Sequence, residues 1–195
     1  MSAIDFFFDY RSPYSYLAHS QLGRLGAEVT FFPFDLLNLM KQVENVPTSV
    51  VCKPKNRYVM QDLARWSARY GVPVQRHPQA REIDARRLLR ATLAAGQAGK
   101  MAAAVAAIFK AYWGGPQPLQ SVGEVAAVLA GAGLDAPALE PLIDAPETDR
   151  ALDDATAAAV ARGVFGSPTF FVGEQMFFGN DRLDFVRDSL AKAAA

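Results

Sequence analysis

The stretch DYRSPYSY, residues 9–16, contains the spacing of a redox motif without its sulfurs. Ser12 and Ser15 stand where the two cysteines of a Cys-x-x-Cys motif would stand, so a hydroxyl replaces each thiol. An apolar run precedes the stretch and a helical pattern follows it, which predicts Ser12 as an N-cap and Pro13 as the first helical residue. The free N–H groups of a helix N-terminus favour an anion. Ser12 therefore either only caps the helix, or also directs its hydroxyl outward to a bound anion.

Two segments near the C-terminus could bind a ligand. In residues 165–169, FGSPT, Pro168 either begins a strand in the trans form or turns the chain in the cis form. In the second case Ser167 would offer its backbone N–H and C=O to an extended peptide. In residues 178–182, FGNDR, Asn180 and Asp181 either cap a last helix or hold the charged groups of a ligand.

Composition excludes several classes of function. The chain has 195 residues, 51% of them hydrophobic, which suits one domain with a sizeable insertion. Twenty basic residues balance twenty acidic ones, so neither nucleic acid nor an anionic membrane is an expected partner. Cys52 is the one cysteine, and two isolated histidines lack metal-ligand spacing, so no metal is expected. Without a basic n-region or a long apolar run, the chain is expected to be cytoplasmic.

These candidate residues must be positioned by strands and helices in a particular order. Residues 3–9 and 28–34 predict strands around a helix that follows Ser12, which makes a βαβ unit. The C-terminal part predicts a hairpin over residues 169–178 and a last helix. The middle predicts only helices, at residues 58–70, 85–95, 100–113, 121–133 and 148–162. We therefore expect an α/β, thioredoxin-like βαβ…ββα domain, residues 1–56 and 164–195, split by an all-helical insertion, residues 57–163.

Four stretches in the expected order carry a resemblance to a known family. They read DFFFDYRSPYSYLA, KNRYVMQDLARWSARYGVP, FKAYWGG and VFGSPTFFVGEQMFFGNDRL. Together they resemble the 2-hydroxychromene-2-carboxylate isomerases, glutathione-dependent relatives of the kappa-class glutathione transferases, over nearly the full length. The resemblance implies a thioredoxin-like fold with a helical insertion, and it implies a homodimer.

The resemblance also implies a cofactor and its binding residues. Glutathione would supply the missing thiol, with Ser12 as the catalytic residue that stabilises the thiolate. Reversible addition of this thiolate, bond rotation and elimination would interconvert 2-hydroxychromene-2-carboxylate and trans-o-hydroxybenzylidenepyruvate. The residues implied to bind glutathione are Ser12, Ser167, Pro168, Phe178, Gly179, Asn180 and Asp181.

Three further residues are candidates for binding the aromatic substrate. Lys41 follows the second strand, where the family places a lysine, although Lys53 and Lys55 lie in the same loop. Arg86, followed by a second arginine, begins an insertion helix and alternatively belongs to a solvated face. Trp113 precedes two glycines and either packs between helices or lines the substrate cleft.

Three rival functions fit parts of the pattern. A kappa-type glutathione transferase or peroxidase would use the same thiolate on other electrophiles. A non-catalytic module could use the Pro168 loop to capture extended peptides. A thiol–disulfide oxidoreductase would need cysteines at the start of the helix, where this chain has serines.

Overall fold

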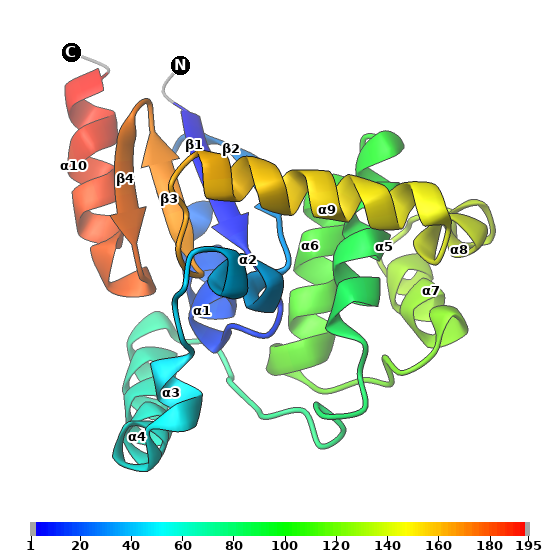
Figure 1. The fold of residues 1–195 in the computed structure, drawn as a ribbon, viewed down its shortest axis with the longest axis horizontal. Coiled ribbons are helices and arrows are strands. Elements are labelled where there is room, and N and C mark those ends of the chain that lie inside the picture. The colour runs from blue at the N-terminus through cyan, green and yellow to red at the C-terminus, as the bar shows by residue number, and fades with distance from the viewer. Residues whose placement is uncertain (1–2, 194–195) are drawn as a thin grey trace.

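A computed structural model describes residues 3–193 and contains one mixed four-stranded sheet (Figure 1). Its order is β2-β1-β3-β4, with β1 parallel to β2 and antiparallel to β3, and with β3 antiparallel to β4. Strand β2 lies at an edge and ends at Pro33, where the missing N–H of proline costs no ladder bond. The strands are β1 (Ala3–Phe8), β2 (Glu28–Pro33), β3 (Thr169–Val172) and β4 (Gln175–Phe178).

Ten α-helices surround this sheet within residues 3–193, in the predicted order of βαβ, helical block and ββα. The first four are α1 (Pro13–Leu22), α2 (Leu36–Gln42), α3 (Thr48–Val51) and α4 (Lys53–Tyr70). The next four are α5 (Ala85–Gln97), α6 (Met101–Phe109), α7 (Val122–Gly131) and α8 (Ala136–Ile143). The last two are α9 (Pro146–Ala161) and α10 (Leu183–Ala193), and none of the ten combines the length and apolar character that crossing a bilayer requires.

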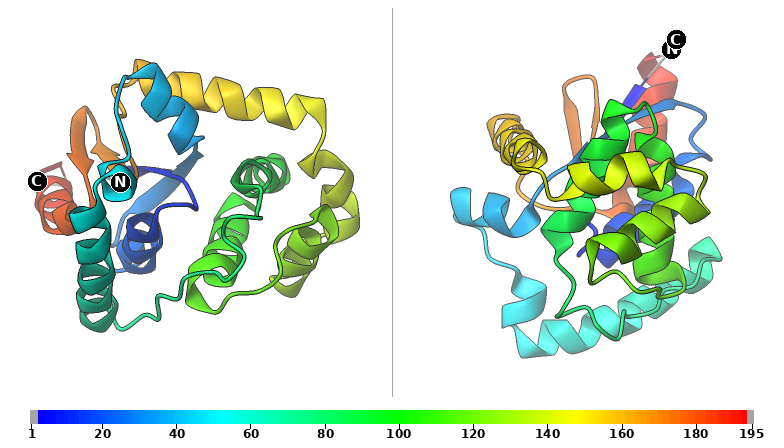
Figure 2. Two further views of the ribbon diagram at one scale, coloured as in Figure 1. Left: turned by 60° about the horizontal axis from the view of Figure 1, so that its bottom comes forward. Right: turned by 90° about the vertical axis from the view of Figure 1, so that its right-hand side faces the viewer.

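The helical block lies to one side of the sheet, and α9 leads back from it to β3 (Figure 2). Helix α4, most of which belongs to the predicted insertion, packs against α1 of the predicted thioredoxin-like domain. The division of the chain at residues 56 and 164 stays a prediction. Several elements depart from the sequence prediction. Asp35 caps α2, which lies with α3 in a stretch expected to be loop, and α8 lies where no helix was predicted. Helix α6 continues into a π-helical turn over Lys110–Gly114.

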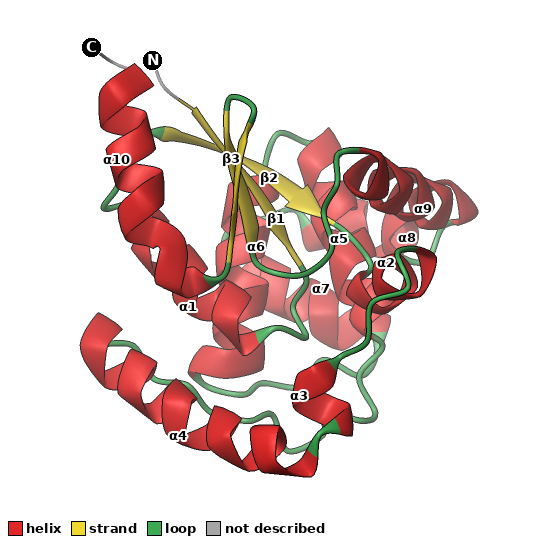
Figure 3. Ribbon diagram, turned by 60° about the vertical axis from the view of Figure 1, so that its left-hand side comes forward, coloured by secondary structure: helices red, strands yellow, loops and turns green. Residues whose placement is uncertain are grey.

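Alternation along β1 sends side chains to two separate cores. Ile4, Phe6 and Phe8 enter the larger core, which includes residues of α1, α10 and the insertion. Phe7 faces the opposite side and packs in a smaller core with residues of α2 and α9. Figure 3 shows α1 and α10 on one side of the sheet and α2 and α9 on the other. This period of two is what a strand buried on both faces requires.

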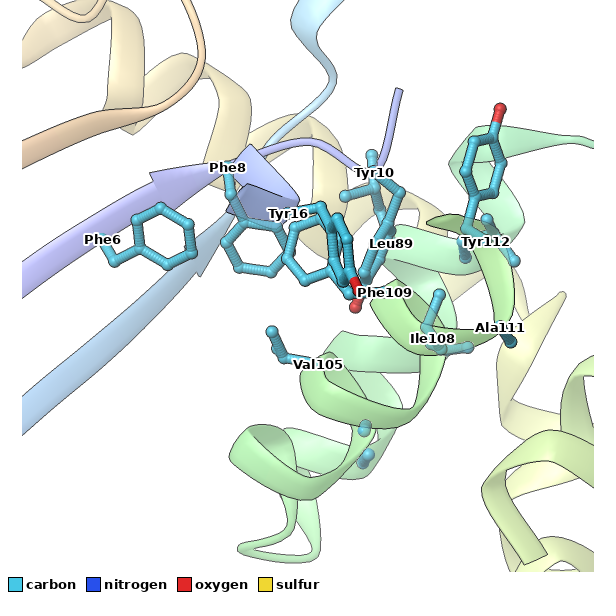
Figure 4. Close-up of a cluster of buried hydrophobic side chains, with 14 of the residues drawn as sticks. Phe6, Phe8, Tyr10, Tyr16, Leu89, Val105, Ile108, Phe109, Ala111 and Tyr112 are labelled. Atoms are coloured by element: carbon cyan, nitrogen blue, oxygen red, sulfur yellow. The ribbon is translucent and has the colours of Figure 1, made fainter. Parts of the chain in front are cut away.

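Aromatic side chains join the sheet to the insertion at the end of β1. Phe109 of α6 is fully buried, with ring centroids 5.4 Å from Phe8 and 4.7 Å from Tyr10 (Figure 4). The Tyr10 hydroxyl shares a 2.6 Å hydrogen bond with Thr92 of α5. Burial of an aromatic side chain of this size contributes about 2–3 kcal/mol to the stability of the fold. The insertion therefore packs directly against the strand that leads to Ser12.

His19 makes the stability of this core depend on pH. It lies on α1 with its ring 5.2 Å from that of Phe109 and 6.0 Å from that of Phe31, and desolvation lowers its pKa to about 4. The unfolded chain, with a histidine pKa of about 6.5, binds a proton more readily, so stability is complete above that pH and is lost as pH falls toward 4.

We expect the free energy of unfolding to fall by about 1–2 kcal/mol between about pH 7 and pH 5. Urea unfolding monitored by circular dichroism would measure it, with His19→Gln as the control that lacks the titrating group. A glutamine variant with the same pH dependence as the wild type would contradict this origin.

Candidate functional site

The turn from β1 into α1 places Ser12 at the start of the helix, as predicted. The backbone N–H of Ser12 donates to Asp9 O at 3.1 Å, and the Ser12 hydroxyl accepts from the backbone N–H of Ser15 at 3.2 Å. Pro13 is the first helical residue. The side chain of Ser12 thus caps a helix of ten residues whose N-terminus opens at the site.

The Ser12 hydroxyl points to the loop before β3, whereas the sequence left open whether it faces outward. Its proton is donated to the carbonyl oxygen of Ser167 at 3.0 Å, and the side chain is buried. The bond joins the N-terminus of α1 to the loop before β3. To donate to a bound anion, the O–H must rotate away from Ser167 O, and an exchange of this kind needs no movement of the backbone.

Ser15 belongs to the same cluster, although its spacing alone gave no reason to include it. Its fully buried hydroxyl lies 2.6 Å from the Ser167 hydroxyl, which also accepts from the backbone N–H of Asp9 at 3.0 Å. Three serines and the end of β1 therefore form one hydrogen-bonded unit. The one available signal was that Ser15 follows Ser12 by one helical turn and so lies on the same helix face.

The two C-terminal candidate segments meet each other in the structure. The Ser167–Pro168 peptide bond is cis, as the ligand-binding alternative required. The carbonyl of Pro168 accepts from the backbone N–H of Gly179 at 3.0 Å. Gly179 has a φ of 100°, and a Cβ there would lie 2.5 Å from Asp181 Oδ1. Glycine is therefore needed to bring the start of the last helix against the Pro168 loop.

Asn180 does not cap the last helix through its side chain, contrary to the capping alternative. A 3₁₀ turn over Asn180–Arg182 precedes α10, and it has no side-chain cap. Asn180 is 4% exposed, and its Nδ2 has no hydrogen-bond partner among residues 3–193. Asp181 is half-exposed and pairs with Arg182 at 2.5 Å.

Helix α4 contacts this region at two points. Tyr14 directly precedes Ser15, and its hydroxyl donates to Asp62 Oδ2 at 2.8 Å. The Tyr70 hydroxyl donates to the carbonyl of Asn180 at 3.1 Å. Since desolvation and the hydrogen bond to Asp62 raise the pKa of Tyr14, its hydroxyl stays protonated at neutral pH.

Hydrogen-bonding groups suited to an extended peptide lie in the Pro168 loop and in the segment bonded to it. Within the described part of the chain, no residue accepts from the backbone N–H of Ser167. The orphaned amide of Asn180 and the carboxylate of Asp181 lie on the segment bonded to Pro168. A buried donor without a partner costs about 1–3 kcal/mol, so a ligand that accepts from it would be stabilised. The donor set fits a small peptide with charged ends.

Charged residues support the turn that carries Ser12. The buried carboxylate of Asp9 accepts from the backbone N–H of Arg11 at 2.8 Å and of Leu36 at 2.9 Å, and it pairs with the Arg11 guanidinium. Arg11 also reaches Asp35 Oδ1 at 2.5 Å. Burial alone would raise the pKa of Asp35, but Arg11 and Arg86 more than offset this and hold it below its usual value. Asp9 and Asp35 both follow parallel strands, a signal that they share one edge of the sheet.

The three candidates for substrate binding are not brought together. Lys41 is exposed in the last turn of α2. Arg86, with a side chain 28% exposed, pairs with the carboxylates of Asp35, Asp149 and Asp153. The buried indole of Trp113 donates to Tyr10 O at 2.7 Å, which matches the packing alternative. A role in substrate binding stays a prediction for all three.

Comparison with known proteins gives consistent matches. A family model described as a DSBA-like thioredoxin domain matches residues 3–191. The 2-hydroxychromene-2-carboxylate isomerase of Pseudomonas putida is 34% identical over 196 residues, covering 97% of this chain and 94% of the relative. That of Sphingobium xenophagum is 35% identical over 192 residues, covering 96% and 97%. A solved 2-hydroxychromene-2-carboxylate isomerase superposes with a TM-score of 0.89 at 31% identity, covering 98% of this chain and 96% of the other.

Proposed function

Because the chain belongs to the DSBA-like thioredoxin domain family and, within it, to the 2-hydroxychromene-2-carboxylate isomerases, we propose that it is a glutathione-dependent isomerase of aromatic degradation. Its reaction would interconvert 2-hydroxychromene-2-carboxylate and trans-o-hydroxybenzylidenepyruvate. The observation that carries the cofactor assignment is the 3.0 Å hydrogen bond from the Ser12 hydroxyl to Ser167 O at the N-terminus of α1. It places a hydroxyl donor, a helix N-terminus and a cis-proline loop at one point.

The binding residues follow from the polar groups of the site. The backbone N–H of Ser167, beside Pro168, would donate to the peptide backbone of glutathione, and the Ser167 carbonyl would accept from it once the Ser12 hydroxyl turns to the sulfur. Asp181 would hold its ammonium group, and the unpaired amide of Asn180 would donate to a carboxylate. Phe178 and Gly179 would shape this end of the site through the bond from Gly179 N–H to Pro168 O.

Ser12 would act by donating a hydrogen bond to the sulfur. Bound glutathione would supply the nucleophilic sulfur for reversible addition to a conjugated carbon of the substrate. A free thiol has a pKa of about 8.5, so the site must lower that value to hold thiolate at neutral pH. The Ser12 hydroxyl, once relieved of Ser167 O, and the N-terminus of α1 both favour the charged form. Serine at this position also cannot form a mixed disulfide with the cofactor.

The proposed reaction can be followed directly by absorbance. Purified protein is expected to isomerise 2-hydroxychromene-2-carboxylate when glutathione is added, and to leave the amount of glutathione unchanged. S-methylglutathione, which fills the same peptide site but has no thiol, serves as the matched control and should not support turnover. Lack of stimulation by glutathione would refute the reaction.

The same assay separates the rival functions. Consumption of glutathione with an electrophilic aromatic compound, without isomerisation, would indicate a transferase. Calorimetric binding of unrelated peptides as tightly as glutathione, without turnover, would indicate a peptide-binding module. A homodimer remains a prediction from the resemblance, which sedimentation velocity would test. A cytoplasmic location remains a prediction from the sequence pattern.

A further inference from the structure

A continuous series of ion pairs runs from the turn before Ser12 into the helical insertion. The turn is closed by the bond from Ser12 N–H to Asp9 O, and the Arg11 side chain folds back onto the Asp9 carboxylate. Arg11 extends the series to Asp35, at the start of α2. The other oxygen of Asp35 accepts from Arg86 Nη1 at 3.0 Å, and Arg86 belongs to the first turn of α5.

Arg86 is itself held in place from the far side. Its Nη2 donates to Asp149 Oδ1 at 2.8 Å and to Asp153 Oδ1 at 3.0 Å, both on α9. Helix α9 continues directly toward the Pro168 loop and β3. The guanidinium of Arg86 therefore lies between the N-terminus of α2 and α9. A planar fork with five donors suits this geometry, which a single ammonium point charge does not reproduce.

The exposure of the three carboxylates indicates which of these ion pairs affects the position of Ser12. The side chain of Asp35 is 7% exposed, whereas those of Asp149 and Asp153 are 45% and 54% exposed. Pairs between exposed charges contribute little, because water and salt screen them. Loss of one partner from a buried carboxylate is costly, and the remaining partner must then compensate. Without Arg86, Arg11 would be the one remaining cationic partner of Asp35, beside the capped N–H of Asn38, and Arg11 would be drawn away from Asp9.

We propose that Arg86 is a positioning residue for Ser12, acting through Asp35 and Arg11 to hold the turn from Asp9 to Ser12 in place. The inference rests on the proposed function, since its consequence appears in the thiolate that Ser12 stabilises. It assigns Arg86 a role that differs from contact with the substrate. The two roles predict different results for glutathione bound without any aromatic substrate.

The test measures the pKa of glutathione bound to the protein in the absence of substrate. Ultraviolet absorbance of the thiolate, titrated against pH, reports this pKa. Arg86→Gln is expected to raise it by about half a unit, which is about threefold less thiolate at a pH below the pKa. Arg87→Gln is the matched control, because Arg87 pairs with Asp144 and Gln120 O and does not touch Asp35. The control should leave the thiol pKa at the wild-type value.

Each outcome separates the possible roles of Arg86. A higher KM for the aromatic substrate with an unchanged thiol pKa would mean substrate contact and would overturn the positioning role. Equal shifts in Arg86→Gln and Arg87→Gln would mean general weakening of the insertion and would also overturn it. Arg86→Lys should shift the pKa in the same direction by less. If Arg86→Gln does not fold and Arg86→Lys does, a thiol pKa in Arg86→Lys equal to that in the wild type overturns the proposal.

The failure of the proposed function would look different. In that case the wild-type protein itself would give no thiolate signal with glutathione. A wild-type signal that Arg86→Gln does not change would leave the proposed function intact and would remove only the positioning role.

Discussion

Ser12→Ala is expected to slow glutathione-dependent isomerisation by about 10²-fold, comparable to the loss of one donor from an oxyanion-binding site. The alanine variant lacks the hydroxyl that would donate to the sulfur, so the pKa of bound glutathione should rise toward about 8.5. The rate should therefore recover partly at higher pH. Steady-state rates across a range of pH, together with the ultraviolet titration of the thiolate, would measure both effects.

Two variants isolate the hydroxyl from the cap that Ser12 also provides. Loss of the N-cap alone destabilises the fold by about 1 kcal/mol without altering the chemistry. Ser12→Thr keeps both a hydroxyl and a cap and should retain much of the activity. Ser20→Ala removes a hydroxyl from the same helix, one that donates only to Leu17 O. A thiol pKa in Ser12→Ala equal to that in Ser20→Ala would exclude Ser12 from the mechanism.

Phe109→Ala is expected to give the largest loss of stability, about 3–5 kcal/mol. Phe109 is fully buried, and its ring lies against those of Phe8, Tyr10 and His19, so its removal leaves a cavity between the insertion and the sheet. Rigid neighbours from three elements cannot close such a cavity. Urea unfolding at neutral pH would measure the change in the free energy of unfolding.

Phe185→Ala provides the control for this prediction. Phe185 is 57% exposed on α10, so its removal should change stability by no more than about 0.5 kcal/mol. If both variants lost the same stability, Phe109 would not join the insertion to the sheet. Phe109→Leu, which fills part of the cavity, should be intermediate between alanine and the wild type.

Much of the fold could be predicted because its signals are local. The order of strands and helices follows from short periodic runs, and β3 and β4 have the predicted bounds. Ser121 and Glu124 form a capping box at the start of a predicted helix, since both partners lie within one turn. Helix ends were less predictable. Helix α4 begins at Lys53, before the periodic stretch: its first residues are exposed, and Pro54 lies in its first turn, where the missing N–H costs no helix bond.

The candidate site divides in the same way. The types and spacing of Ser12 and Pro13 identified the helix start, and the motif around Pro168 identified the loop that faces it. Neither motif indicated that the Ser12 hydroxyl donates to Ser167, or that Ser15 joins the same cluster. Arg86 shows the converse. Its sequence context indicated a solvated or substrate-binding cation, whereas the structure surrounds it with carboxylates from α2 and α9.

The sequence by itself determined the family, the order of elements and the start of α1 at Ser12 and Pro13, because these signals lie in short stretches of the chain. The tertiary structure alone decided the partners of each polar group. Ser12 and Ser167 are 155 positions apart, yet their hydrogen bond is 3.0 Å long. Such pairing depends on how β1, β3 and the helices pack together, and a displacement of about 1 Å would break it.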